Sequence, residues 1–439
     1  IVGQIIGSGI FASPGPLLVQ SGSVGMALVI WLLAGVLSMT GAYCYAELGT
    51  MIPASGGEYQ YLLQAFGPLT ALTYSWTMVM LCNGIALAAI SLVFAQYVCN
   101  LFADLSTRET AAAVPGGMVK LVAVSAIMTV ALVNCISRRS GSRVQDIFTA
   151  AKLGAIAIIV LIGAGWAVSG RSTLENFHEP FQGTTTEPLR YSTATYLALF
   201  SYVGWNNLNY AAGELKNPRR NLPLAITISL LLVIACYLLA NLAYLVVLPL
   251  DVVRTSNTVA MDFGMYTLGK FGKYFMAVMV AMSSFGAING LIVAGSRVTL
   301  ASTSAHAIFP RALARLHPTR ETPVRALLFV GVVASAWACT GDFAQLANVV
   351  MFLFWISYLA TVLGLLRMRI SFPDAPRAFR VWTPVAVVFC IVTAFLVIAP
   401  LLDASGNIWM YVACICGSLL AVPLYWVRVQ PPAFLRRHR

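Results

Sequence analysis

Charged side chains are scarce in this sequence, because Asp, Glu, Lys and Arg together make up 10% of its 439 residues. Soluble globular domains carry about 25% charged residues, so this composition excludes an ordinary water-exposed fold. The hydrophobic share is 59% and the mean hydropathy is +0.83. We therefore expect lipid, rather than water, to surround most of the chain.

Patterns that hold metals or carry out catalysis are also missing. The four histidines are scattered and belong to no HExxH motif, and no acidic cluster accompanies them. The nine cysteines form no CxxC pair, and nearly all lie in apolar stretches, where a thiol packs as a small hydrophobic group. We expect no metal site, no cofactor and no membrane-bound enzyme. The sequence contains neither the rings of charged residues nor the carbonyl filter that are typical of a channel.

The sequence is instead rich in apolar runs of about 20 residues, each long enough to cross a bilayer as a helix. Alternating strand patterns are absent, so a barrel is not expected. We predict an all-α integral membrane protein with twelve transmembrane helices. The expected segments are 1–21, 25–51, 68–102, 118–136, 146–168, 192–212, 223–248, 274–304, 323–340, 343–366, 382–402 and 408–427.

Basic residues alternate between the two sets of loops that these segments define. One set, with the C-terminal tail, holds eighteen Lys and Arg residues, and the other holds seven. Loops rich in Lys and Arg stay on the cytoplasmic side, so we expect both termini there, with a further cytoplasmic tail before Ile1. The basic residues are not gathered on one soluble face, as a nucleic-acid surface requires. We therefore expect the lipid bilayer, and no nucleic acid, as a partner.

Two glycines interrupt the first segment, which reads IIGSGIF over residues 5–11. Each Gly costs about 1 kcal/mol relative to Ala inside a helix, and unwound backbone at membrane depth is tolerated where it lines a cavity or is buried by protein. A break here would expose N–H groups at a helix N-terminus, which attract a carboxylate. A packing face of small residues is the alternative.

A second interruption is expected in the sixth segment, where Gly204 and Trp205 precede Asn206, Asn207 and Asn209. Polar side chains inside a span are costly unless they face a cavity. Breaks five helices apart are typical of two inverted five-helix repeats around a midplane site. Carbonyl ends at this break would accept hydrogen bonds from an ammonium group, so the two breaks together suit a zwitterion. Alternatively, the asparagines bond only across helices.

Further stretches of the chain complete a family pattern. They are IVGQIIGSGIF (1–11), CYAELG (44–49), SGG (55–57), RVQD (143–146), AKL (151–153), GWN (204–206), ELKNP (214–218), NLP (221–223) and SFGAING (284–290). The chain resembles the light-chain L-type amino acid transporters of the amino acid–polyamine–organocation superfamily, essentially from end to end. The resemblance implies a LeuT-type fold with alternating access in a single transporter domain over 1–439. The first repeat would cover 1–168, the inverted repeat 192–366, and two additional helices 382–427.

The resemblance also implies where a substrate binds. The carboxylate would lie on backbone amides around Gly7, Ser8 and Gly9, and the amino group on carbonyls near Ile6 and Phe200. Phe200 and Trp205 resemble the aromatic pair that covers such a site. The predicted substrate-binding residues are Ile6, Gly7, Ser8, Gly9, Ile10, Phe200, Val203, Gly204, Trp205 and Asn206, with Asn83, Ala86, Ile90 and Phe354 shaping the side-chain pocket.

Two features point to the cargo and its coupling. Lys152 lies inside the fifth segment, and the resemblance implies that it occupies the space used by sodium in ion-coupled relatives, where an ammonium repels Na⁺. Snorkelling to the interface is the alternative for this side chain. Val203 and Asn206, on either side of the Gly-Trp step, are uncharged, and we expect no unpaired carboxylate at the pocket. A cationic side chain would be desolvated there without an opposite charge.

We therefore predict a sodium-independent exchanger or facilitator of neutral L-amino acids in the plasma membrane. A cationic or broad-range exchanger, or an amino acid sensor with the same pocket, is the alternative. Family light chains commonly link to a single-span heavy chain through a cysteine in the outer loop after the third segment. Residues 100–117 contain no cysteine, and Cys99 falls at the helix end. We expect no disulfide-linked heavy chain, whereas noncovalent association stays open.

Overall fold

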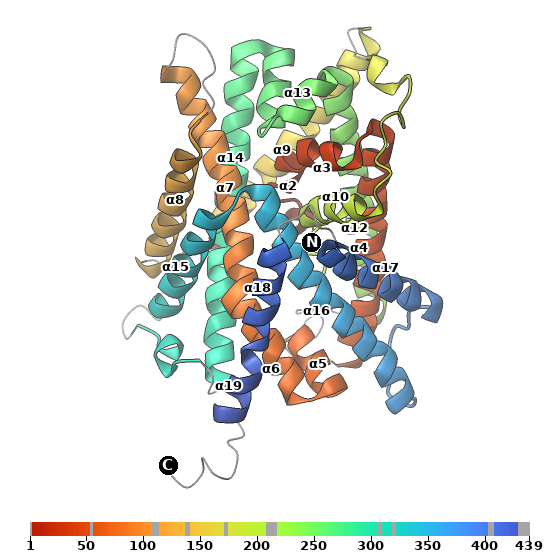
Figure 1. The fold of residues 1–439 in the computed structure, drawn as a ribbon, viewed down its shortest axis with the longest axis vertical. Helices are drawn as coiled ribbons and strands as arrows, with labels where there is room; N and C mark the ends of the chain where they lie inside the picture. Colours follow the sequence, from red (N-terminus) through yellow and green to blue (C-terminus); the bar gives the residue numbers. More distant parts are fainter. Residues whose placement is uncertain are drawn as a thin grey trace.

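The computed structural model describes residues 2–52, 56–106, 114–136, 141–170, 174–207, 217–305, 309–317, 322–402 and 408–428. Within these ranges the chain is helical and contains no strand (Figure 1). Nine helices among the described residues are long and apolar enough to cross a membrane. The prediction of an all-α, multi-span membrane fold is confirmed.

The nine long spans follow the expected order along the chain. They lie in α4 (Val24–Met51), the continuous run of α6 (Pro68–Thr77), η1 (Met78–Cys82) and α7 (Asn83–Ser106), α8 (Gly116–Ile136), α9 (Gly141–Val168), α12 (Pro218–Val247), α14 (Val259–Ala305), α16 (Phe343–Ser371), α17 (Thr383–Leu402) and α18 with α19 (Ile408–Leu419 and Ala421–Arg428).

Three of the twelve expected segments are not among these nine spans. The ninth segment is α15 (Val324–Thr340), which is apolar but has only 17 residues. The first and the sixth segments are each broken into shorter pieces. Helix length alone therefore confirms nine spans rather than twelve, and two of the three exceptions are the segments for which a break was predicted.

Local sequence explains how several helices begin and bend. Ser23 caps α4, since its hydroxyl accepts the Met26 N–H at 3.4 Å. Asp342 and Gln345 form a capping box at the start of α16. Gly269 has φ 65° and bends α14. The part of α14 before this bend lies outside the segment expected at 274–304.

The two ends of the molecule carry different short helices. In Figure 1 the C terminus, α19, α6 and α5 (Glu58–Phe66) lie at the bottom end, and α13 (Leu250–Thr255) lies near the top. Two 3₁₀ turns, η2 (Leu174–Phe177) and η4 (Arg311–Ala314), lie in the connections. The pieces of the first and sixth segments lie between these ends, and both contact the surrounding long helices.

Large aliphatic side chains are exposed on the outer helices. Leu121 on α8, Leu161 on α9 and Ile391 on α17 are 67%, 71% and 64% exposed. A contiguous apolar exterior of this extent is unfavourable in water. It suits a surface that faces lipid chains.

Candidate functional site

The first segment is interrupted at Ile6, Gly7 and Ser8. Helix α1 (Val2–Ile5) ends before these residues, and α2 (Gly9–Ala12) and α3 (Pro14–Ser21) follow them. The break predicted from the Gly-Ser-Gly motif is therefore confirmed.

This break leaves backbone groups without partners. Within the part of the chain that the structure describes, the N–H groups of Ser8, Gly9 and Ile10 donate to no acceptor, and the Ile6 carbonyl accepts no hydrogen bond. An added Cβ on Gly7 would have the Ile5 carbonyl oxygen as its nearest contact, at 3.9 Å. Free donors, a free acceptor and space thus occur together.

The sixth segment is interrupted immediately after Ser201. Helix α10 (Pro188–Ser201) ends there, and residues 202–206 form a turn. Gly204 has φ 109°, a conformation that a side chain would strain. This second predicted break is also confirmed, although Asn209 lies outside the described residues.

The two breaks are in direct contact. An added Cβ on Gly9 would lie 2.9 Å from the Ser201 Cα, and one on Gly204 would lie 3.2 Å from the Gln4 carbonyl oxygen. Only the absence of a side chain at these glycines allows such an approach. The start of α2 therefore lies against the end of α10, and the end of α1 lies against the turn.

Tyr237 on α12 bonds to both broken helices. Its hydroxyl lies 2.8 Å from the Ser201 carbonyl oxygen and 3.3 Å from the Ile5 carbonyl oxygen. These carbonyls end α10 and α1, where a helix has no acceptor partners of its own. The sequence analysis missed Tyr237, because its position within a regular span gives no local signal.

Several buried polar atoms near the breaks have no partner. The hydroxyls of Ser8 and Ser201 are 1% and 2% exposed by residue, and neither makes a hydrogen bond within the described structure. The Asn83 side-chain nitrogen on α7 is also unpartnered. Burying such groups unsatisfied costs about 1–3 kcal/mol each, a cost that a bound polar molecule would remove.

The two aromatic residues of the predicted site pack on different neighbours. Phe200 meets Phe343 with ring centroids 5.4 Å apart. Trp205 lies 5.0 Å from Tyr45 and 4.9 Å from Tyr358. Phe200 thus packs before the turn and Trp205 within it, each against a different group of side chains.

A buried carboxylate, missed by the sequence analysis, lies beside the Gly-Trp step. Glu58, the first residue of α5, is 1% exposed, and its Oε1 accepts a hydrogen bond from the Asn206 side-chain nitrogen at 2.6 Å. Asn206 therefore bonds across elements, as one alternative held. The expectation of no unpaired carboxylate at the pocket stays a prediction, since Glu58 accepts this hydrogen bond.

The remaining predicted residues lie on long helices. Lys152 on α9 is 3% exposed and forms no ion pair with a described carboxylate, which disfavours snorkelling. Ala86 is buried and Ile90 half-buried on α7. Phe354 stacks on Tyr358 one turn along α16, at 6.1 Å and 12°.

Comparison with known proteins gives one consistent family. A family model described as amino acid permease matches residues 1–420. The b(0,+)-type amino acid transporter 1 of Mus musculus is 40% identical over 430 residues, covering 98% of this chain and 86% of the relative. The human form is 39% identical with the same coverage.

A second group of relatives is almost as similar. The Large neutral amino acids transporter small subunit 2 of Rattus norvegicus is 37% identical over 437 residues, which are 98% of this chain and 78% of the relative. These matches confirm the resemblance to L-type transporters and the expectation of a membrane transporter rather than an enzyme. The chain belongs to the amino acid permease family.

Proposed function

We propose that this protein exchanges neutral L-amino acids across a membrane without sodium, and that the zwitterion binds between the two breaks. The contact of the breaks supports this most strongly, because Gly9 lies against Ser201 and Gly204 lies against Gln4. Free N–H groups at one helix start then lie close to the carbonyl ends of two helices. An amino acid zwitterion carries a carboxylate and an ammonium on one carbon, so it needs both the N–H donors and the carbonyl acceptors.

The proposed pose combines the free N–H groups of Ser8 and Gly9 and the free Ile6 carbonyl with the positions that the family resemblance implies. The carboxylate binds the amides of Gly7, Ser8 and Gly9, where the helix start favours an anion. The ammonium binds the carbonyls of Ile6 and Phe200. The side chain extends toward residues on the surrounding elements, which are Ile10, Val203, Gly204, Trp205 and Asn206, with Asn83, Ala86, Ile90 and Phe354.

Selectivity for neutral side chains is supported by Val203 and Asn206, which carry no charge. The Glu58 carboxylate already accepts a hydrogen bond from Asn206, and one relative is named for large neutral amino acids. A broad-range exchanger that also accepts cationic amino acids is the second candidate. The buried Glu58 carboxylate favours this second candidate, because the carboxylate puts a negative charge beside the Gly-Trp step.

Sodium independence is proposed from Lys152, whose buried ammonium would repel Na⁺. Its helix, α9, contacts α1 of the broken segment. Two inverted repeats over 1–168 and 192–366, followed by 382–427, stay part of this proposal. Alternating access between the repeats would open the site to each side in turn.

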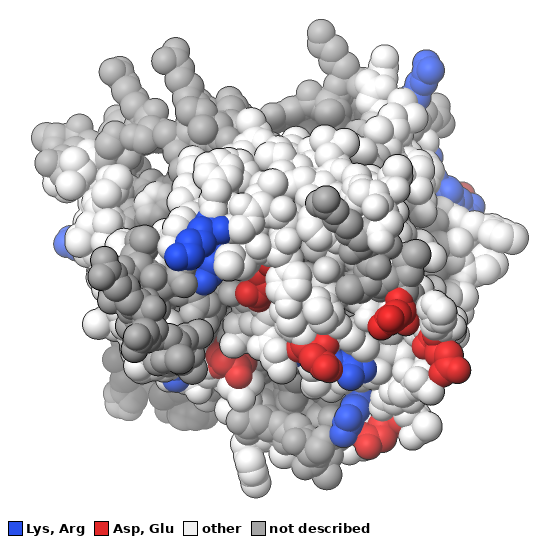
Figure 2. Space-filling model, turned by 90° about the horizontal axis from the view of Figure 1, so that it is seen from above, with Lys and Arg blue, Asp and Glu red and all other residues white. Residues whose placement is uncertain are grey.

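The membrane orientation is proposed with both termini in the cytoplasm and the protein in the plasma membrane. Figure 2 shows the end opposite the C terminus, where acidic and basic side chains are mixed on a mostly uncharged face. Glu187, the residue before α10, pairs with Arg190 at 2.7 Å. Among the described residues, a face with mixed charges suits the outside.

We propose that no disulfide joins this chain to a heavy chain at the outer loop after α7. Cys99 is buried within α7, and residues 107–113 of that loop lie outside the described residues. Noncovalent association with a single-span partner is compatible with this arrangement.

Purified protein in liposomes tests the function. Vesicles preloaded with unlabelled leucine are expected to take up labelled leucine faster than empty vesicles, at equal rates in sodium and choline chloride. Arginine uptake at leucine-like efficiency would move the assignment to the broad-range candidate. Binding without uptake would indicate a sensor, and strict sodium dependence would contradict the role of Lys152.

A further inference from the structure

The hydrogen bond between Glu58 and Asn206 connects two distant parts of the chain. Glu58 begins the short helix α5, and Asn206 ends the turn that follows α10; they are 148 residues apart in sequence. The amide nitrogen of Asn206 donates to Oε1 of Glu58 at 2.6 Å, and hydrogen bonds accepted by a carboxylate are stronger than those between neutral groups.

The local backbone directs this carboxylate inward. Gly56 and Gly57 have φ of 124° and 51°, so the turn before α5 uses conformations that favour glycine. The side chain then lies at a helix N-terminus, where the helix dipole stabilises a negative charge. Burying a carboxylate is still costly, so packing alone does not account for Glu58 at this position.

Aromatic side chains from α4, α16 and the pair's own elements gather around it. Tyr45 on α4 has its ring 5.0 Å from Trp205, 5.9 Å from Tyr358 on α16 and 6.1 Å from Tyr61 on α5. Burial, and to a smaller extent the Glu58 carboxylate, raises the pKa of the Tyr61 phenol well above its usual value. Among the described residues, the Tyr61 phenol is thus one titratable group close to Glu58.

The pair lies on the side of the breaks that faces the C-terminal end of the molecule. Figure 1 shows α5 at that end, beside α6 and α19. The turn that contains Gly204 is thus joined, through Asn206, to a helix at this end. Movement of the turn away from α5 would have to break the hydrogen bond and separate Trp205 from Tyr45.

We propose that Glu58 is a positioning residue of the transport cycle, whose carboxylate holds Asn206 and so keeps the amino acid site closed toward the C-terminal end. This inference rests on the proposed exchange function. The site opens toward that end when the Glu58–Asn206 hydrogen bond breaks. A bound amino acid that contacts Asn206 competes for its amide, so opening is linked to occupancy, as obligatory exchange requires.

Efflux from proteoliposomes tests this role. Vesicles loaded with labelled leucine are diluted into buffer with or without unlabelled leucine. The measured ratio is the efflux rate without external leucine divided by the efflux rate with it. Glu58→Ala is expected to raise this ratio about tenfold, as the loss of one hydrogen bond to a charged group predicts. Glu187→Gln, an exposed carboxylate at the opposite end, is the control and is expected to keep the wild-type ratio.

Variants that swap the donor and the acceptor between positions 58 and 206 distinguish a positioning role of Glu58 from a loss of structure. Asn206→Asp sets two carboxylates against each other, so exchange is expected to be weak at neutral pH and to recover as acid supplies one shared proton. Glu58→Gln combined with Asn206→Asp restores one donor and one acceptor with the roles exchanged. This double variant is expected to regain exchange at neutral pH and to lose the acid dependence.

The outcomes are distinct from failure of the proposed function. Absence of leucine exchange in the wild type would refute the function itself. An unchanged efflux ratio in a folded Glu58→Ala protein would overturn the positioning role. If Glu58→Ala does not fold, the double variant decides, because activity no better than that of Asn206→Asp at neutral pH would also overturn it.

Discussion

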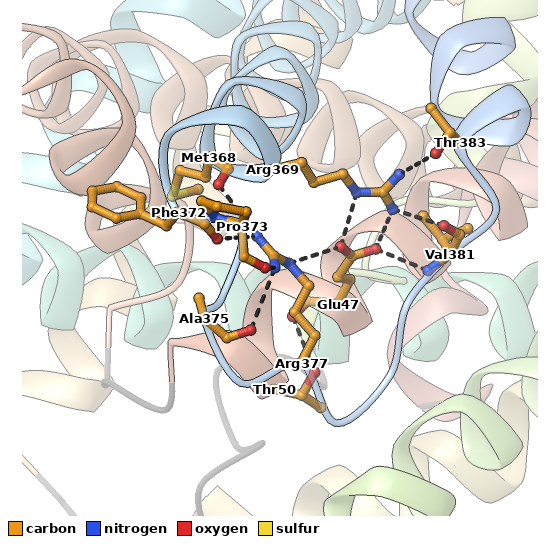
Figure 3. Close-up of polar contacts among 10 residues, drawn as sticks. All are labelled: Glu47, Thr50, Met368, Arg369, Phe372, Pro373, Ala375, Arg377, Val381 and Thr383. Carbon is orange, nitrogen blue, oxygen red and sulfur yellow. Dashed lines mark hydrogen bonds and ion pairs between the residues drawn. The ribbon is translucent and has the colours of Figure 1, made fainter.

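Arg369 on α16 binds both carboxylate oxygens of Glu47 on α4, through Nε and one terminal nitrogen (Figure 3). Glu47 is fully buried, and its Oε2 also accepts the Val381 N–H at 2.8 Å. Arg377 contributes a second positive charge, with Nε 3.5 Å from Glu47 Oε1. One carboxylate thus joins α4 to α16 and to the connection that precedes α17.

Removal of this carboxylate is expected to destabilise the protein strongly. Glu47→Gln leaves two buried guanidinium groups without their counter-charge, and breaking a buried pair costs about 3–5 kcal/mol. The unfolding temperature of the detergent-purified protein measures the effect. Glu187→Gln, which breaks an exposed pair, is expected to stay within about 1 kcal/mol of wild type; equal losses in both variants would contradict the interpretation.

Loss of the Tyr237 hydroxyl is expected to reduce exchange more than stability. Tyr237→Phe keeps the ring contacts with Trp31 and Tyr202 but leaves the carbonyl ends of α1 and α10 without this donor. A buried acceptor left unsatisfied costs about 1–3 kcal/mol, so the exchange rate should fall about tenfold. Leucine exchange in proteoliposomes is the measurement.

Tyr196→Phe is the matched control for this variant. The Tyr196 hydroxyl is equally buried and donates to the Leu396 carbonyl on α17 at 2.7 Å, rather than to a carbonyl at either break. We expect a similar loss of stability with exchange largely retained. Equal loss of exchange in both variants would show that the effect of Tyr237→Phe is a general one.

Two alanine substitutions in the first break are expected to behave differently. Gly9→Ala places a Cβ 2.9 Å from the Ser201 Cα, and overpacking of this kind costs about 1–3 kcal/mol. Gly7→Ala has room for its Cβ, so the protein should fold normally. The added methyl occupies space proposed for the carboxylate, and the half-saturation concentration for leucine should rise.

Unfolding temperature and uptake kinetics distinguish the two alanine variants. A stable Gly7→Ala protein with unchanged half-saturation would place the carboxylate elsewhere. A Gly9→Ala protein as stable as wild type would mean that α2 and α10 move apart at little cost.

The breaks themselves could be predicted from local sequence, whereas the contacts that hold them could not. Gly7 and Gly9 weaken a helix wherever they occur, and Gly204 permits a positive φ, so each leaves a signal within a few residues. Tyr237 meets Ile5 across 232 residues. No local pattern encodes such a contact, since it depends on how the spans pack.

Glu58 was missed for a related reason. It follows Gly56 and Gly57 in a short polar connection, where an acidic residue is typical of a solvated helix start. Its burial becomes evident only when α5 is packed against α16 and the turn at Asn206. Lys152 was noticed because a basic residue inside an apolar run is conspicuous in any span.

The charge of Lys152 is expected to support substrate binding. Lys152→Met keeps an unbranched apolar stem of similar length and removes a buried positive charge on a helix that contacts α1. Attraction between that charge and the substrate carboxylate is lost, so the half-saturation concentration should rise about threefold to tenfold.

Lys120→Met is the control, because its ammonium is exposed and donates to the Cys339 carbonyl. Leucine uptake is measured for both variants in sodium and choline chloride. An unchanged half-saturation concentration in Lys152→Met would contradict the proposed attraction, and a similar rise in Lys120→Met would show that the effect is not specific to the buried site.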